Sequence, residues 1–257
     1  MRKAWLIIPL FLLLTGLVMA QRGRRGGFGG YGGYGEGGYI PEEIQTAREV
    51  PSHSTDTPMW TNPVGFEKDV FTFTRVRRER NPNAYGGNWQ TDTPDSDLNL
   101  SYRLQQMTSM KVSPDGRYLR LTDKDLSNYP FIYMVEPGSL YLNDEEVVAL
   151  RKYLMNGGFL MLDDFWGDSE WANAEQVMKQ VFPDRSFVEL PLDHPIYHCV
   201  FQINSKGQIP NYRQGEASQY DGITWEQGHD GDVRTVHHRA IFDDKGRIMV
   251  IATHNTD

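Results

Sequence analysis

Residues 129–166 read YPFIYMVEPGSLYLNDEEVVALRKYLMNGGFLMLDDFW, and this stretch decides the fold. Phe131–Val135 is a short apolar run, as expected of a strand that is buried on both faces. Asn143 precedes a run of acids, which is the pattern of a capped helix start, and the Asn-Gly-Gly at 156–158 provides a left-handed stop. Residues 159–162 are a second apolar run. The pattern therefore predicts strand, helix and strand, joined by the crossover that favours a parallel sheet.

Two adjacent carboxylates, Asp163 and Asp164, follow the second strand. Ligands of parallel sheets bind beyond the carboxyl ends of the strands, so a functional interpretation makes these residues ligands of a metal ion or a polar substrate. In the alternative interpretation one carboxylate caps the next loop and the other is solvated, because acids at strand ends often serve turns. Neighbouring side chains of a strand point to opposite faces, so only one of the two faces a cleft unless the strand has already ended.

Local patterns also predict the remaining elements. β-branched and aromatic residues indicate a first strand, Thr93-Pro94-Asp95 is typical of a helix start, and Ser169 can cap a later helix. The polar loop at 78–92 is long and contains glycine, as functional loops at strand ends often do. We expect strands at 70–77, 187–190, 239–242 and 248–252, helices at 94–108 and 169–181, a short strand or hairpin within 111–121, and an irregular insertion at 204–231.

The first 69 residues differ in composition from the rest of the chain. Residues 1–20 have a basic start, an apolar run and a small-residue ending, which predicts a secretory signal peptide cut after Ala20; an uncleaved membrane anchor is the alternative. Residues 21–38 are rich in glycine, arginine and tyrosine and predict a flexible tether. Residues 39–69 predict an irregular extension, and 70–257 form the α/β domain.

Charge and cysteine content restrict the function classes. The net charge is −8 although the first 38 residues are basic, so the domain is acidic and a poor candidate for binding nucleic acid. The arginines of the tether favour a weak contact with anionic lipid or cell wall over RNA, because an exported chain does not meet RNA. Cys199 is the only cysteine, and its apolar neighbours predict an inward-facing strand position. Export without an internal disulfide suits a bacterial envelope protein.

No local motif identifies a nucleophile or a metal site. The sequence has no Gly-x-Ser-x-Gly elbow and no phosphate-binding glycine loop after a strand. His194 and His198 are an i, i+4 pair, but Pro195 between them disfavours a helix. A metal site made of Asp164, His194 and His254 stays an open alternative. The sequence requires no cofactor, and a divalent metal is the one candidate.

Several short motifs together resemble one bacterial family. They are Phe73-x-Arg75, Asn88-Trp89-x-x-Asp92, Tyr129-Pro130-Phe131, Leu150-x-x-Tyr153-Leu154-x-x-Gly157-Gly158, Asp163-Asp164, His194-Pro195-Ile196 and His254-Asn255-Thr256-Asp257. Over about residues 70–257 the chain resembles the family catalogued as domain of unknown function 4159 (DUF4159). That resemblance implies a class I glutamine amidotransferase-like, flavodoxin-like fold, which is a three-layer, mostly parallel, doubly wound sheet. The ligand-binding candidates within the motifs are Arg75, Trp89, Asp92, Asp163, Asp164, His194, His254, Asn255 and Asp257.

The resemblance also implies a place for a nucleophile, at the turn that follows the second strand of the central unit. This chain has Asp163-Asp164-Phe165 there and no cysteine. A carboxylate is a poor replacement for a thiolate that attacks an amide, and no Cys, His and Glu triad is identifiable, so we do not expect glutaminase activity. Relatives continue past the final Asn-Thr-Asp, so we also expect that a last strand and helix are missing from this sequence.

These observations predict an exported protein of the periplasm or cell envelope, with a non-catalytic amidotransferase-like domain that binds a ligand or a protein partner. The first alternative is a metal-assisted hydrolase that acts on an envelope glycan or a similar polymer, with Asp163 or Asp164 and the two histidines His194 and His254 at its centre. The second is a structural scaffold in an envelope protein complex. The oligomeric state and the ligand stay open.

Overall fold

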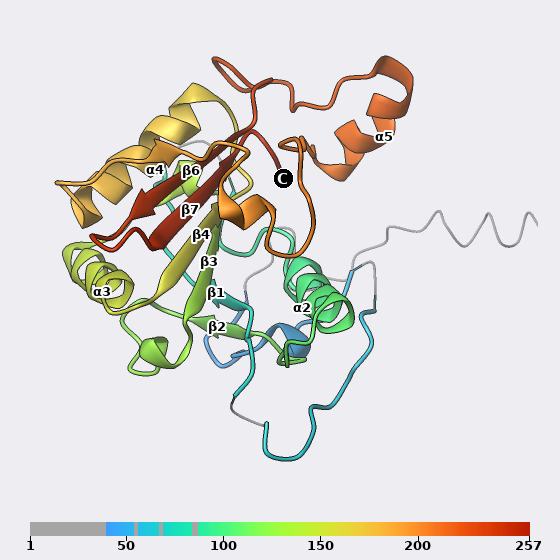
Figure 1. Cartoon of the computed structure of the whole chain (residues 1–257), viewed down its shortest axis with the longest axis vertical. Helices are drawn as coiled ribbons and strands as arrows, with labels where there is room; N and C mark the ends of the chain where they lie inside the picture. Colours follow the sequence, from blue (N-terminus) through green and yellow to red (C-terminus); the bar gives the residue numbers. More distant parts are fainter. Residues whose placement is uncertain (1–39, 54–55, 67–68, 84–86) are drawn as a thin grey trace, which may run out of the picture. The chain divides into compact units, whose positions relative to one another are not determined.

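A computed structural model describes residues 40–53, 56–66, 69–83 and 87–257, so the predicted signal peptide and tether at 1–38 lie outside the described residues. Seven strands form one sheet in the order β2-β1-β3-β4-β7-β6-β5 (Figure 1). The first five strands of that order run parallel, and β6 and β5 are antiparallel to their neighbours. The strands are β1 (Thr74–Val76), β2 (Arg117–Leu119), β3 (Phe131–Val135), β4 (Phe159–Asp163), β5 (Val188–Glu189), β6 (His237–Phe242) and β7 (Ile248–His254).

The described residues also form four α-helices and four short 3-10 helices. The α-helices are α2 (Asp95–Met107), α3 (Asp144–Met155), α4 (Gly167–Val181) and α5 (Tyr212–Asp221). The 3-10 helices are η1 (Ala47–Glu49), η2 (Leu126–Asn128), η3 (Pro137–Ser139) and η4 (Pro195–Tyr197). None of the helices that the structure describes is long and apolar enough to cross a membrane.

The central unit has the predicted strand, helix and strand. β3 and β4 pair in parallel from Phe131 with Phe159 to Val135 with Asp163. Asn143 caps α3, because its side chain accepts a hydrogen bond from the Glu146 N–H at 3.0 Å and the Glu146 carboxylate accepts one from the Asn143 N–H at 3.0 Å. This reciprocal pair satisfies two helix-end donors, so the helix begins where the sequence predicts.

The two faces of the sheet bury different side chains, as the alternation of β3 shows. Ile132 and Met134 point into the main core, to which α3 and α4 contribute. Tyr133 and Val135 point to the opposite face, where they pack with Phe73, the residue before β1. Figure 1 shows α2 across the sheet from α3 and α4. Helices therefore lie on both faces, and the carboxyl ends of the parallel strands meet at one edge.

Several local predictions are corrected by the structure. Of the two alternatives predicted for residues 111–121, the short strand is confirmed as β2 and the hairpin is not, because β2 pairs in parallel with β1. The helix after Trp166 begins at Gly167, so Ser169 lies in its first turn and does not cap it. The insertion at 204–231 contains α5. Cys199 is exposed beyond η4, with its thiol 3.4 Å from the Ile196 carbonyl, and does not face inward from a strand.

The carboxyl-terminal hairpin and the amino-terminal extension complete the fold. β6 and β7 are the predicted hairpin, and β5 is the predicted edge strand. The described part of the extension packs onto the domain, because Ile40, Ala47 and Val50 are buried against Leu98 and Tyr118.

Candidate functional site

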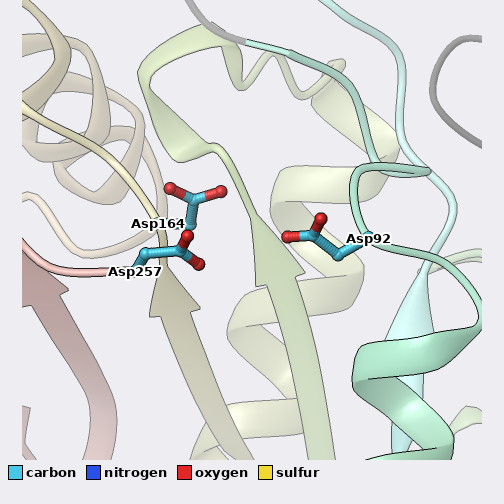
Figure 2. Close-up of side chains that lie close together, drawn as sticks. All are labelled: Asp92, Asp164 and Asp257. Carbon is cyan, nitrogen blue, oxygen red and sulfur yellow. The ribbon is translucent and has the colours of Figure 1, made fainter. Parts of the chain in front are cut away.

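Three aspartates from three separate segments converge at the carboxyl edge of the sheet. Asp92 lies in the loop before α2, Asp164 directly follows β4, and Asp257 follows β7. Each offers a carboxylate oxygen, and these oxygens all lie within 4.8 Å of one another. Figure 2 shows the three side chains pointing toward a common space between the strand ends. No other described group of acids, histidines or cysteines has this geometry.

The backbone at the end of β4 explains how Asp163 and Asp164 take different roles. β4 ends at Asp163, and Asp164 has a φ of 56°, which is left-handed. Asp163 accepts hydrogen bonds from the Tyr133 hydroxyl at 3.1 Å and from the Thr253 hydroxyl. Asp164 turns into the three-aspartate cluster instead. Asp163 is therefore hydrogen-bonded within the domain, and Asp164 is half-buried among other acids.

Left-handed backbone recurs around the cluster. Asp92 has a φ of 60°, Glu136 of 54°, Asp164 of 56° and Asn255 of 62°. A non-glycine residue rarely adopts this conformation, which costs about 1–3 kcal/mol and persists where the surrounding structure enforces it. The strand ends are thus bent so that polar side chains face the edge of the sheet.

Glu136 is a further acidic residue of the site that the sequence does not single out. It directly follows β3, and its carboxylate accepts a hydrogen bond from the Gly87 N–H at 2.6 Å. The buried Arg78 side chain donates to the Glu136 carbonyl at 2.6 Å and to the Ser139 hydroxyl at 3.1 Å, which fixes the turn. The one local feature of the sequence that could have indicated Glu136 is its position between a buried strand and a Pro-Gly pair.

Burial and mutual repulsion raise the pKa values of the acids at this edge. Burial, and then the charges of Asp257 and Glu136, raise the pKa of Asp164 well above its ordinary value. Burial, and then Asp92 and Asp163, raise the pKa of Asp257 to about 7. Burial also raises the pKa values of Glu136 and Asp163. Such a cluster is stabilised by a proton or a cation, which would relieve the repulsion.

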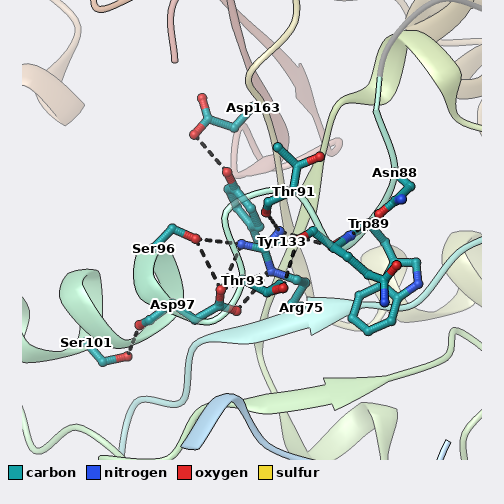
Figure 3. A network of polar contacts seen from close by, with 11 residues as sticks. Arg75, Asn88, Trp89, Thr91, Thr93, Ser96, Asp97, Ser101, Tyr133 and Asp163 are labelled. Carbon is teal, nitrogen blue, oxygen red and sulfur yellow. Dashed lines mark hydrogen bonds and ion pairs between the residues drawn. The ribbon is translucent and has the colours of Figure 1, made fainter. Parts of the chain in front are cut away.

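Arg75 fixes the loop that carries Asp92, as Figure 3 shows. Its guanidinium forms a bidentate pair with Asp97 of α2, with an Nη2 to Oδ2 distance of 2.8 Å. It also donates to the carbonyls of Trp89 at 3.1 Å and Thr91 at 2.9 Å, on the amino-terminal side of Asp92. Arg75 and Asp97 side chains are both 0% exposed. Arg75 was a ligand candidate, and the structure makes it a positioning residue.

Trp89 also belongs to the core rather than to the acidic cluster. Its ring lies edge-on to Tyr118, with 5.4 Å between the centroids, and the Arg77 guanidinium lies 4.8 Å above it. Trp89 therefore anchors the same loop from its apolar side.

The histidine candidates do not join the aspartates. The His254 ring is buried, and its Nε2 donates to the Gly167 carbonyl at 2.9 Å, because a carbonyl only accepts. His194 accepts the Ile196 N–H at 3.3 Å and caps η4. Asp164, His194 and His254 therefore do not form the metal set that the sequence left open, since the described residues hold only the three-aspartate group.

Asn255 connects the site to the segment that follows α5. Its side-chain oxygen accepts the Gly167 N–H at 2.9 Å, and its side-chain nitrogen donates to the carbonyls of Asp232 and Thr235, each at 2.8 Å. These bonds hold the ends of β4 and β7 side by side, so Asn255 is a structural element of the site.

Comparison with known protein families places the domain in a family. A family model described as "Domain of unknown function (DUF4159)" matches residues 72–257, which include every segment of the site. No curated protein matches the sequence.

Proposed function

The chain belongs to the DUF4159 family, and from the site that this domain builds we propose that it is an exported envelope protein that binds a positively charged ligand at the carboxyl edge of its sheet. The ligand class is a divalent cation, or a ligand that carries one or presents a cationic group. The proposal includes no covalent catalysis.

The convergence of Asp92, Asp164 and Asp257 carries this proposal. Neither Asp164 nor Asp257 receives a side-chain hydrogen bond or an ion pair from any residue in the described part of the chain. Carboxylate oxygens are the ligands that calcium, magnesium and manganese prefer. A cation at this position would remove the repulsion that helps to raise the pKa values of Asp164 and Asp257.

We also propose that the domain is a relative of the class I glutamine amidotransferase-like fold. The parallel strands in the order β2-β1-β3-β4-β7 support this likeness, because it is the order of flavodoxin-like sheets. β4 ends at Asp163, Asp164 begins the turn that follows, and Cys199 lies beyond η4. A binding role accounts for these acids without a thiolate nucleophile.

Thermal unfolding of the full chain tests the cation site. Millimolar calcium, magnesium or manganese should raise the Tm, because a ligand that binds only the folded state stabilises it. Asp164→Asn should abolish this rise. The same variant should not lower the Tm in the presence of a chelator, because it removes a repelled charge.

Asp144→Asn is the matched control, since Asp144 is an exposed acid at the start of α3 and far from the strand ends in sequence. It should keep the full cation response. A wild-type Tm that none of the three cations raises would contradict the proposed ligand class.

A second function is favoured by the acids beside the cluster. Glu136 and Asp163 have raised pKa values close to three potential metal ligands, and this combination is typical of metal-assisted hydrolysis. The substrate would be an envelope glycan or a similar polymer. Release of reducing ends from cell-wall glycan with manganese, lost in Asp164→Asn and Glu136→Gln but not in Asp144→Asn, would establish it. Absence of release with every cation tested would reject it.

Export and partners rest on the amino-terminal sequence, and we propose that residues 1–20 direct export and that the tether places the domain in an envelope complex. Fractionation of the producing cells should find the protein in the periplasm or envelope, with Gln21 as its first residue. An uncut chain recovered from the cytoplasm would contradict this proposal. Purification from membranes with and without residues 21–69 should change the set of associated proteins.

A further inference from the structure

The segment that follows α5, residues 222–236, caps the first turn of α4, and we call it the strap. The Asp168 N–H donates to the Asp230 carbonyl at 3.1 Å, and the Ser169 N–H donates to the Asp230 carboxylate at 3.1 Å. The Ser169 hydroxyl donates to the same carboxylate at 2.6 Å. The first N–H groups of a helix have no acceptor within the helix, so the strap supplies the acceptors that this helix end needs.

Two glycines allow the strap to approach α4 this closely. Gly167 has a φ of 75° and Gly231 a φ of 68°. A Cβ atom at Gly167 would overlap the Asp230 carbonyl, and one at Gly231 would overlap the Asp168 carboxylate. The contact therefore depends on glycine on both sides.

The strap is attached to both segments that hold Asp164 and Asp257. Gly167 follows Asp164 by three residues, and Asn255 precedes Asp257 by two. The Asn255 side chain holds the strap by its donations to the Asp232 and Thr235 carbonyls. Figure 1 shows α5 and its flanking segments on the side of the sheet where the carboxyl-terminal end of the chain lies.

His229 joins the strap to α4 through charge. Its Nδ1 lies 3.1 Å from the buried Glu170 carboxylate of α4, and its Nε2 lies 3.5 Å from the Glu226 carboxylate of the strap. A neutral imidazole has one N–H and only an imidazolium can donate to both acids. The carboxylates of Glu170 and then Glu226 raise the pKa of His229 to about 10, so the ring is charged near neutral pH and forms an ion pair with each acid.

We propose that the strap is a latched lid that controls access to the aspartate cluster, and that the His229 imidazolium is its latch. This inference rests on the proposed function, since it assumes that a cation enters at the strand ends. The strap bonds to Asp168 and Asn255, which are close in sequence to Asp164 and Asp257. The charge of Glu226 in the strap also contributes to the raised pKa of Asp257.

Residue-resolved amide hydrogen exchange on the full chain tests the latch. His229→Gln should speed exchange at the Asp168 and Ser169 amides by about tenfold, a ratio equal to about 1.4 kcal/mol. The Phe182 amide, which bonds to the Met178 carbonyl at the far end of α4, should not change. His229→Lys keeps the positive charge and should restore most of the protection.

Gln227→Ala is the matched control, because Gln227 is an exposed neighbour on the same strap. It should leave exchange unchanged. Unchanged protection in His229→Gln, or equal loss in His229→Gln and His229→Lys, would overturn the ionic latch.

The rate of manganese association tests access and separates the two proposals. Association should be about tenfold faster in His229→Gln, because the lid is open more often. An unchanged rate would overturn the role in access. Amide exchange needs no ligand, so it decides the latch even if no cation binds, whereas failure of the proposed function appears as a wild-type chain that manganese does not bind.

Discussion

Asp97→Asn tests whether the buried ion pair with Arg75 organises the site. The variant keeps the shape of the side chain and removes its charge, which leaves the Arg75 guanidinium buried beside a neutral amide. Both side chains are 0% exposed in the wild type, so water does not compensate the lost charge. Breaking a buried pair in this way costs about 3–5 kcal/mol.

Urea unfolding measures this loss. With an m-value of about 2 kcal/mol/M, the midpoint should fall by about 2 M. Asp144→Asn makes the same substitution in the first turn of α3, where the side chain is exposed, and should cost less than about 1 kcal/mol. Equal midpoint shifts in the two variants would refute the buried pair as the organiser of this region.

A double variant keeps the test decisive if Asp97→Asn fails to fold. Arg75→Met with Asp97→Leu removes both charges and should be more stable than Asp97→Asn, because neither charge is left unpaired. The double variant should still lose the cation response. Without the Arg75 guanidinium, the carbonyls of Trp89 and Thr91 have no donor that holds the loop of Asp92 in place. A full cation response in the double variant would show that Arg75 does not position Asp92.

Three further predictions follow from single contacts. Gly138→Ala should destabilise the chain by about 1–3 kcal/mol in urea unfolding, because the new Cβ would lie 2.5 Å from the Glu170 Cγ. Gly215→Ala in α5 is the control: its new Cβ would have no atom within 4 Å, so the change should be neutral or stabilising by about 1 kcal/mol. Asn143→Ala should cost about 1 kcal/mol in the same measurement, because α3 loses its cap. Burial lowers the pKa of His254 to about 4. Between pH 6.5 and 4 the unfolded state therefore binds more protons than the folded state, and the free energy of unfolding should fall by up to about 3 kcal/mol as the pH falls through this window. Thermal unfolding across that range should show a shallower pH slope in His254→Gln, and an equal slope would contradict the assignment.

The sequence determined the central unit of the fold because its signals are local. The apolar runs of β3 and β4, the cap at Asn143 and the glycines after α3 all act within a few residues of the structure they specify. The hairpin of β6 and β7 was predicted for the same reason. The sequence also predicted that acidic side chains gather at the end of β4, since parallel strands present their carboxyl ends at one edge.

The strap and the histidine positions required the tertiary structure. Ser169 has a residue type that often caps helices. The acceptors for the first turn of α4 come instead from Asp230, which follows α5 in the chain. His194 and His254 have side chains suited to metals, but one ring nitrogen of each bonds to a backbone group, and the other nitrogen of His254 bonds to the Arg239 guanidinium. Residue type alone does not reveal which partner a side chain reaches.

The aspartate cluster shows the same division most clearly. The sequence by itself determined that Asp163 and Asp164 end a buried strand, and the motifs included Asp92 and Asp257 among nine candidates. Only the tertiary structure selected Asp92, Asp164 and Asp257 as one group and added Glu136 beside them. The physical reason is that strand order and left-handed backbone at the strand ends decide which carboxylates converge, and both depend on contacts between residues far apart in the chain.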